Sequence, residues 1–327
     1  MASADEPETR KLRLAPQESI ANAALAALAF GAQALERERD AAVSGEVEPI
    51  HQLRVASRRL RAAIEMFPGA VHAAQVGLLR RDLTWLAQCA GKVRESDVIG
   101  DTIRARAPKL EPKLAAMLAP LYSELEVSRR LALAELGEAL SSPRYAATLA
   151  RLRKPRIRVA MSSAALGPAA ATILATMTRA MSRAGAPLAV SSIPETVHRL
   201  RVRVKRMRYA LEMLAALGGK RNRKAIARLE AMQDQLGSFN DTVVAIRWLI
   251  AYASAEGAPP EAVLAAGAMA ESLRRRERKL ARRAMKAWRK FEGGEIMRAA
   301  IDETRRHGHG AHHANTTSAE TATETTK

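Results

Sequence analysis

Apolar positions recur along most of the chain at intervals of three and four residues, which is the spacing of one face of an α-helix. Alternating runs of β-branched residues, which would indicate strands, are hard to find. Proline and glycine divide the pattern into segments, at positions that include Pro49, Pro68, Gly91, Pro143, Pro155, Pro194 and Gly237. The pattern predicts an all-α protein built from long amphipathic helices.

One segment of the chain occurs twice. The sequence HQLRVASRRLR at 51–61 returns as HRLRVRVKRMR at 198–208, an offset of 147 residues (198 − 51). A second pair of similar blocks follows at 86–98 and 232–244, and each block contains a glycine, Gly91 or Gly237, at which we expect a helix to end. Two copies at this spacing predict an internal duplication and a pseudo-twofold architecture.

In an α-helix each residue is rotated by about 100° from the one before it, and this rotation places the cations of the repeated segment on one side of the helix. The first stripe consists of His51, Arg54, Arg58 and Arg61, and the second of His198, Arg201, Lys205 and Arg208. Apolar residues lie opposite both stripes, so each helix can pack while its basic side stays accessible. Like charges on one face repel each other, so we expect a partner that offsets this cost. Carboxylates of other helices, or simple solvation of the face, are the alternatives.

Further basic residues form shorter rows elsewhere. These rows are Lys220, Lys224 and Arg228, then Arg275, Lys279, Arg282 and Lys286, together with Lys92 and Arg94 in the second repeated block. If the rows converge with the two stripes, they form a trough in which arginine makes bidentate contacts to phosphate and lysine supplies a point charge.

The overall charge points to an acidic partner. The chain has 53 Lys and Arg against 34 Asp and Glu, a formal net charge of +19, which predicts salt-sensitive attraction for polyanions. Its single cysteine, Cys89, allows no internal disulfide, and we expect a cytoplasmic location. The apolar stretch 20–35 is too short for a membrane span, so no membrane partner is expected. Polar composition predicts disorder at 1–15 and in the His/Thr-rich tail, 307–327.

The paired His-x-Leu-Arg-Val segments and the blocks that follow them closely resemble the CHAD family, the conserved histidine α-helical domain. The resemblance covers about 16–306, with a first half of about 16–160 and a second of about 161–306. It implies two pseudo-twofold-related four-helix bundles and a central basic groove or pore that binds inorganic polyphosphate, at polyphosphate granules. Carried over by motif, the binding residues are His51, Arg54, Arg58, Arg59, Arg61, His198, Arg201, Lys205, Arg206 and Arg208. A second group of candidates consists of Lys92, Arg94, Lys220, Lys224, Arg228, Arg275, Lys279 and Arg282.

Other functions remain alternatives at this point. An enzyme would use His51 and His198 as acid–base or metal groups near Asp97 and Asp241, but neither histidine has a ligand at metal spacing nearby. We therefore expect no catalysis, no metal and no cofactor. Nucleic acid fits the same charge, but the few aromatics are scattered, so it is expected only as a non-specific competitor. An acidic protein, such as a granule-associated partner, is the third alternative.

Overall fold

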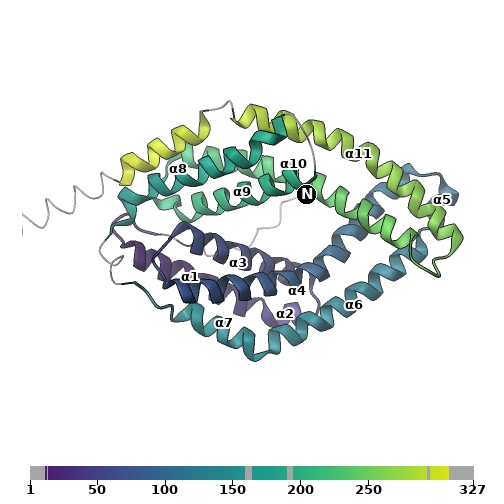
Figure 1. Cartoon of the computed structure of the whole chain (residues 1–327), viewed down its shortest axis with the longest axis horizontal. Coiled ribbons are helices and arrows are strands. Elements are labelled where there is room, and N and C mark those ends of the chain that lie inside the picture. The colour runs from purple at the N-terminus through teal and green to yellow at the C-terminus, as the bar shows by residue number, and fades with distance from the viewer. Residues whose placement is uncertain (1–11, 13, 159–163, 190–193, 293–294, 309–327) are drawn as a thin grey trace, which may run out of the picture.

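The computed structural model describes residues 12, 14–158, 164–189, 194–292 and 295–308 (Figure 1). Its helices are α1 (Ile20–Arg37), α2 (Arg39–Val43), α3 (Val47–Met66), α4 (Ala73–Arg106), α5 (Pro112–Ala116), α6 (Ala119–Ser141), α7 (Pro143–Arg153), α8 (Leu166–Gly185), α9 (Pro194–Met213), α10 (Lys220–Ala253) and α11 (Pro260–Glu292). Short 3-10 segments occur at 107–109, 186–189 and 215–217, and a further helix covers 296–308. These residues form no β-strand, and the prediction of an all-α fold is confirmed.

The helices lie in two groups, one above the other in Figure 1. The lower group contains α1, α3, α4, α6 and α7, and the upper group contains α8, α9, α10 and α11. At the boundary between them α3 packs against α9, and α4 packs against α10. The two helices that carry the repeated segment therefore contact each other.

The repeated segments lie on helices of equal length. α3 and α9 each have 20 residues, and each is followed by a helix of 34 residues, α4 or α10. The prediction that helices end at Gly91 and Gly237 is wrong, because α4 and α10 run through both glycines without a break. Buried apolar residues continue on both sides of each glycine, and their packing outweighs the cost of about 1 kcal/mol for a glycine inside a helix. A Cβ atom added at either glycine would meet nothing within 4 Å.

Local sequence fixes where α3 ends and α4 begins. Pro68 cannot continue a helix because it lacks a backbone N–H, and α3 ends just before it, at Met66. Gly69 then adopts a φ of 82°, a left-handed conformation that glycine adopts without steric cost. This turn reverses the chain, so that α4 packs back along α3.

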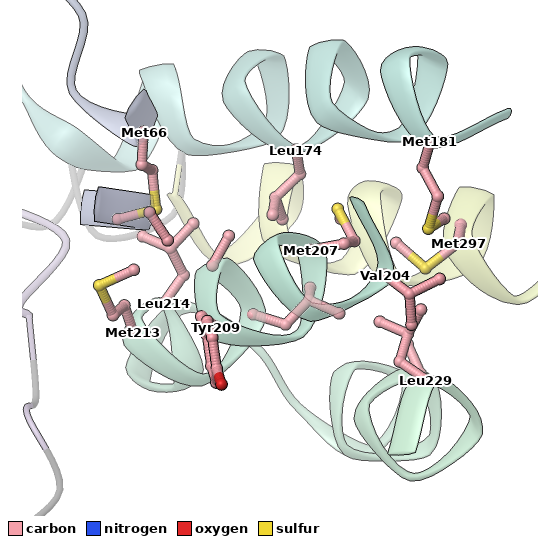
Figure 2. Close-up of a cluster of buried hydrophobic side chains, with 14 of the residues drawn as sticks. Met66, Leu174, Met181, Val204, Met207, Tyr209, Met213, Leu214, Leu229 and Met297 are labelled. Carbon is pink, nitrogen blue, oxygen red and sulfur yellow. The ribbon is translucent and has the colours of Figure 1, made fainter. Parts of the chain in front are cut away.

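Three apolar cores hold the helices together. The core of the upper group includes residues of α3, and Figure 2 shows Met66 pointing into it beside side chains of the upper helices. Its other labelled members are Leu174, Met181, Val204, Met207, Tyr209, Met213, Leu214, Leu229 and Met297. A second core belongs to the lower group, and a third is shared by the far ends of α4, α6, α10 and α11. Shared cores fix α3 relative to α9.

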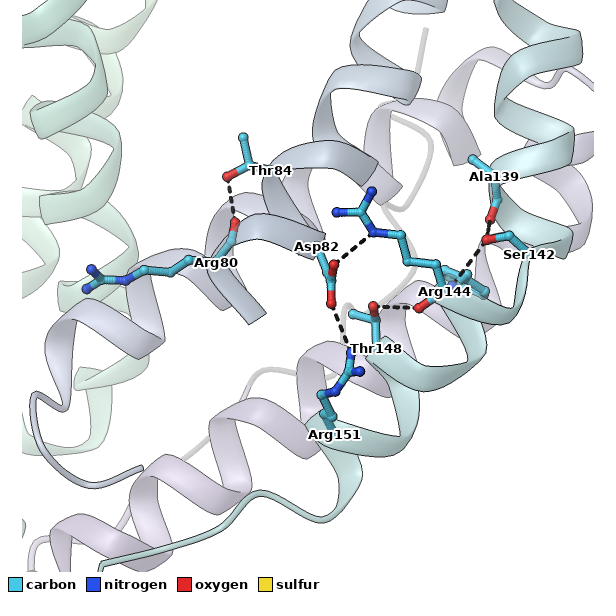
Figure 3. Close-up of polar contacts among 9 residues, drawn as sticks. Arg80, Asp82, Thr84, Ala139, Ser142, Arg144, Thr148 and Arg151 are labelled. Atoms are coloured by element: carbon cyan, nitrogen blue, oxygen red, sulfur yellow. Dashed lines mark hydrogen bonds and ion pairs between the residues drawn. The ribbon is translucent and has the colours of Figure 1, made fainter. Parts of the chain in front are cut away.

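A buried carboxylate fastens α7 to α4 in the lower group. Asp82 of α4 accepts hydrogen bonds from Arg144 Nε at 2.8 Å and from Arg151 Nη1 at 2.9 Å (Figure 3). The guanidinium carbon of Arg144 also lies 4.3 Å from the ring centroid of Trp85. Arg151 therefore helps to hold α7 against α4.

The ends of the chain agree only partly with the predicted disorder. Leu14 is fully buried and Leu12 packs against the upper core, so the order in the structure begins before residue 16. The helix 296–308 covers the first two residues of the predicted tail, and 309–327 lie outside the described residues. No helix among the described residues is both long enough and apolar enough to span a membrane.

Candidate functional site

α3 and α9 each have one buried apolar side and one basic side, as the sequence predicts. Leu53 and Leu60 of α3 and Leu200 and Met207 of α9 are all buried. The side chains at the centre of the two basic stripes are Arg54, Arg58, Arg201 and Lys205, and all four are half-buried. The basic sides therefore lie partly inside the molecule.

Two ion pairs join α3 to α9 reciprocally. Arg59 Nη2 lies 3.1 Å from Glu212 Oε2, and Arg206 Nη1 lies 2.7 Å from Glu65 Oε2. Arg206 stands 147 residues after Arg59, and Glu212 stands 147 residues after Glu65. Each helix thus offers the same arginine and the same glutamate to the other, and the two helices meet in a two-sided, isologous contact.

These ion pairs occupy part of the predicted binding set. Arg208 also has carboxylate partners, at 3.3 Å from Glu212 and 3.1 Å from Glu230, and its guanidinium lies 5.1 Å from the ring centroid of Tyr209. Arg59, Arg206 and Arg208 therefore have their charge balanced by carboxylates. The charge of Arg61 helps to lower the pKa of Arg206, so Arg61 lies near the ion pair between Arg206 and Glu65.

The remaining cations of the two helices form what we call the central cationic cluster: Arg54, Arg58, Arg201 and Lys205. Within the ranges that the structure describes, none of the four forms an ion pair or a side-chain hydrogen bond. The Nε atoms of Arg58 and Arg201 are buried without a hydrogen-bond partner. A buried donor without a partner costs about 1 to 3 kcal/mol, so these atoms favour a ligand that supplies acceptors.

The electrostatics of the cluster are those of uncompensated positive charge. Burial, together with repulsion by Arg201, Arg58 and Arg54, lowers the pKa of Lys205 to about 6 against the opposing effect of Asp241. Burial and the neighbouring guanidinium groups also lower the pKa of Arg54, to about 10. Charged groups repel one another most strongly where water is excluded. An anion placed here would relieve that repulsion.

The two histidines of the repeat lie in different surroundings. Burial lowers the pKa of His51, as do the cations Arg58, Arg94 and Arg54 to a lesser degree, while Glu48 opposes them. His198 is exposed, and its Nδ1 lies 3.3 Å from Asn240 Oδ1. Among the described residues no group of three His, Cys, Asp or Glu could hold a metal ion.

The second group of candidates does not converge on the cluster as one trough. Lys92 pairs with Glu135, and Arg275 pairs with Glu271. Arg94 pairs with Asp97, but its charge still lowers the pKa values of His51 and Arg54, so it lies at the border of the cluster. Lys220 is exposed at the start of α10. Lys224 and Arg228 line a separate cavity of about 550 Å³ between α10, α11 and 296–308, and Lys279 and Arg282 line a hollow on α11.

The CHAD domain family model matches residues 26–250, more than half of the chain. The chain belongs to the CHAD family. Two solved structures share the CHAD fold with it. The CHAD domain from the plant Ricinus communis is 24% identical, with a TM-score of 0.68 over 94% of this chain and 97% of the other. PptA from Streptomyces chartreusis is 18% identical, with a TM-score of 0.66 over 83% of this chain and all (100%) of the other. Among curated proteins, none matches this chain in sequence.

Two features of this CHAD domain escaped the sequence analysis. Asp241 of α10 acts on Arg54, Arg201 and Lys205, so it is the carboxylate that borders the central cationic cluster. Gly91 and Gly237 lie one helical turn before Arg94 and Asp241, on the same faces of α4 and α10, and both face open space. The two glycines occupy the same position in the repeated blocks, which could have indicated that each keeps space open beside its helix instead of ending the helix.

Proposed function

We propose that this protein binds inorganic polyphosphate at the central cationic cluster and does not catalyse a reaction there. The observation that carries the proposal is the pair of buried guanidinium Nε atoms, on Arg58 and Arg201, that have no acceptor. They come from two equivalent helices, so one linear anion that lies between α3 and α9 can contact both. Phosphate oxygens are strong acceptors for guanidinium groups.

The arrangement of carboxylates supports the same proposal. Glu65 and Glu212 pair with the outer arginines and hold the helices together, whereas the four inner basic residues form no ion pair with any described residue. A pattern of this kind places positive charge where a ligand enters and uses ion pairs where the helices must pack. Burial, and after it repulsion by the neighbouring guanidinium groups, lowers the pKa of Lys205 to about 6, and a perturbed pKa of this kind is typical of binding sites.

Nucleic acid is the second candidate partner, and the aromatic residues argue against it. Single-strand binders stack bases on exposed aromatic rings. Tyr209, on the same helix as Arg201 and Lys205, is buried, and the guanidinium groups of Arg59 and Arg208 lie over its ring at 5.5 and 5.1 Å. A phosphate chain without bases needs no such surface. We infer that nucleic acid competes only through its backbone charge.

Location follows from the ligand. A cytoplasmic protein that binds polyphosphate would accumulate on polyphosphate granules, and granule-associated proteins are its expected neighbours. Expression of a fluorescent fusion in cells with and without stored polyphosphate tests this part of the proposal. Diffuse fluorescence in both kinds of cell would contradict it.

A charge-reversal variant tests the site. Arg58→Glu combined with Lys205→Glu removes two cations that contact phosphate, each worth about 1.5 to 3 kcal/mol, so affinity for polyphosphate should fall at least a hundredfold. The slope of log affinity against log salt should fall by roughly 0.7 to 0.9 for each cation removed. The matched control, Lys109→Glu with Lys113→Glu, changes the net charge equally at two exposed positions, one in the 3-10 segment 107–109 and one in α5.

Equal affinity losses in the two variants would show that only net charge matters and would place the site elsewhere. Circular dichroism of both variants checks that helix content is retained. Competition by single-stranded DNA, double-stranded DNA and RNA at equal phosphate concentration tests the alternative partner. Tighter binding of any nucleic acid than of polyphosphate would reverse the order of the two candidates.

A further inference from the structure

A second cationic surface lies on the outer side of α11. Lys279, Arg282, Arg283 and Lys286 are all exposed and together line a shallow hollow of about 250 Å³. Their spacing of three, four and seven residues places them on one face of the helix, over a length of about 10 Å. Leu280, Ala281 and Ala284 face the core instead, so the helix cannot rotate this row away from solvent.

The row is not paired with any carboxylate of the described residues. Glu271, about two turns before Lys279 in α11, pairs with Arg275 and Arg278. In the part of the chain that the structure describes, none of the four residues that line the hollow has an ion pair. Like charges three and four residues apart destabilise a helix, so the row has a cost that a bound anion would offset.

This surface is separate from the central cationic cluster. Figure 1 shows α11 along the outer edge of the upper group, whereas α9 faces the lower group. The charges that act on Arg54 and Lys205 come from α3, α4, α9 and α10, and none of them comes from α11. The aromatic residue nearest in sequence, Trp288, is fully buried, so the hollow offers cations without a ring on which a base could stack.

We propose that the outer face of α11 is a second polyphosphate-binding surface, so that one protein molecule holds two chains and links them. The proposal rests on the proposed function at the central cationic cluster. A protein with two phosphate-binding surfaces on different sides converts separate chains into a network, and the gain in avidity comes from the linkage alone. The protein would then help to condense polyphosphate as well as bind it.

A variant without the outer row tests this. Lys279→Gln, Arg282→Gln, Arg283→Gln and Lys286→Gln are combined, and calorimetry with a short, size-defined polyphosphate should then give one chain per protein in place of two. Light scattering after mixing with long polyphosphate should fall from that of large assemblies to that of single decorated chains. The matched control removes four scattered, exposed cations by Lys109→Gln, Lys113→Gln, Arg130→Gln and Lys154→Gln, and it should keep both the stoichiometry of two and the assemblies.

The outcomes separate this inference from the proposed function. One chain per wild-type molecule, bound at the central cationic cluster, would overturn the inference and leave the proposed function intact. Assemblies that persist in the outer-row variant, or that vanish equally in the scattered control, would also overturn it. Loss of all binding in the outer-row variant, with no effect of Arg58→Glu and Lys205→Glu, would instead overturn the proposed function.

Discussion

Binding of polyphosphate should take up a proton at Lys205. In the empty site, burial and the guanidinium groups of Arg201, Arg58 and Arg54 hold the pKa of this amine at about 6, and Asp241 only partly opposes them. A bound phosphate chain reverses the balance, because it places negative charge beside the amine and favours the ammonium form. The pKa of Lys205 is then higher in the complex than in the free protein, so affinity falls as the pH rises.

The size of the effect follows from the two protonation states. With a pKa of about 6 in the free protein and a higher one in the complex, linkage makes the affinity fall by up to about tenfold per pH unit above that pKa and by less below it. His51 does not titrate in the upper range, because its pKa is below the ordinary value of 6.5. Arg54, with a pKa of about 10, loses its proton only above that range. A bound chain would raise the pKa of His51 as well, so a variant at Lys205 is needed to assign the proton.

Calorimetry with long-chain polyphosphate measures this directly. Long chains are suitable because only their few terminal groups titrate near neutrality. Titrations at pH 8 in two buffers of different ionisation enthalpy should give an uptake of about one proton per site. Lys205→Arg is the informative variant, because a guanidinium keeps its charge and should flatten the pH profile, with an affinity at pH 8 no lower than that of the wild type.

Two results would refute the reasoning. An uptake near zero at pH 8 in the wild-type protein would show that Lys205 is already charged in the empty site or does not contact the ligand. A Lys205→Arg variant with the same pH profile as the wild type would assign the proton to another group.

Three further predictions concern the surroundings of the site. Gly237→Leu should stabilise α10 by up to about 1 kcal/mol, yet it should weaken polyphosphate binding at least tenfold because the new side chain fills the open space beside the cluster. The control, Gly267→Leu at an exposed position of α11, should stabilise its helix without affecting binding. Thermal melts measure the stability of both variants, and calorimetry measures their affinity for polyphosphate. Glu212→Gln should lower the free energy of unfolding in urea by about 1 kcal/mol, because two arginines lose their shared carboxylate. Glu303→Gln should lower the free energy of unfolding by about 1 kcal/mol at neutral pH. The carboxylate of Glu303 caps the N-terminus of α10, where it accepts hydrogen bonds from the backbone N–H groups of Gly219 and Asn222 at 2.8 and 2.9 Å. Those bonds outweigh burial and lower the pKa of Glu303, so the difference from wild type should vanish as the pH falls through that lowered pKa.

The sequence was enough to predict the helices and the sides on which they pack. The apolar positions of α3 and α9 follow the helical period without interruption, and periodicity of this kind reports burial directly. The prediction failed at Gly91 and Gly237, because glycine ends a helix only when no packed face continues beyond it. Tertiary packing on both sides carried α4 and α10 through those positions. That the two halves arose by duplication stays a prediction.

The sequence predicted which helices form the candidate site, but not which of their arginines form ion pairs and which remain unpaired. The helical period placed Arg54, Arg58, Arg201 and Lys205 on accessible stripes, and they form the central cationic cluster. The same motif also contains Arg59 and Arg206, whose carboxylate partners lie in the other half of the chain. Partners so distant in sequence are visible only in three dimensions. The rows on α10 and α11 point elsewhere for the same reason, since their direction depends on how the bundles pack.

The reciprocal exchange between Arg59 and Glu212 on one side, and Arg206 and Glu65 on the other, makes the contact between α3 and α9 self-complementary. A fragment that contained only one half would present a surface that matches a second copy of itself. Within the full chain, α3 and α9 meet in the way that two copies of one subunit meet across a twofold axis. Because both helices belong to one chain, the two sides of this contact need not be identical, and equivalent positions hold Arg58 on one helix and Lys205 on the other.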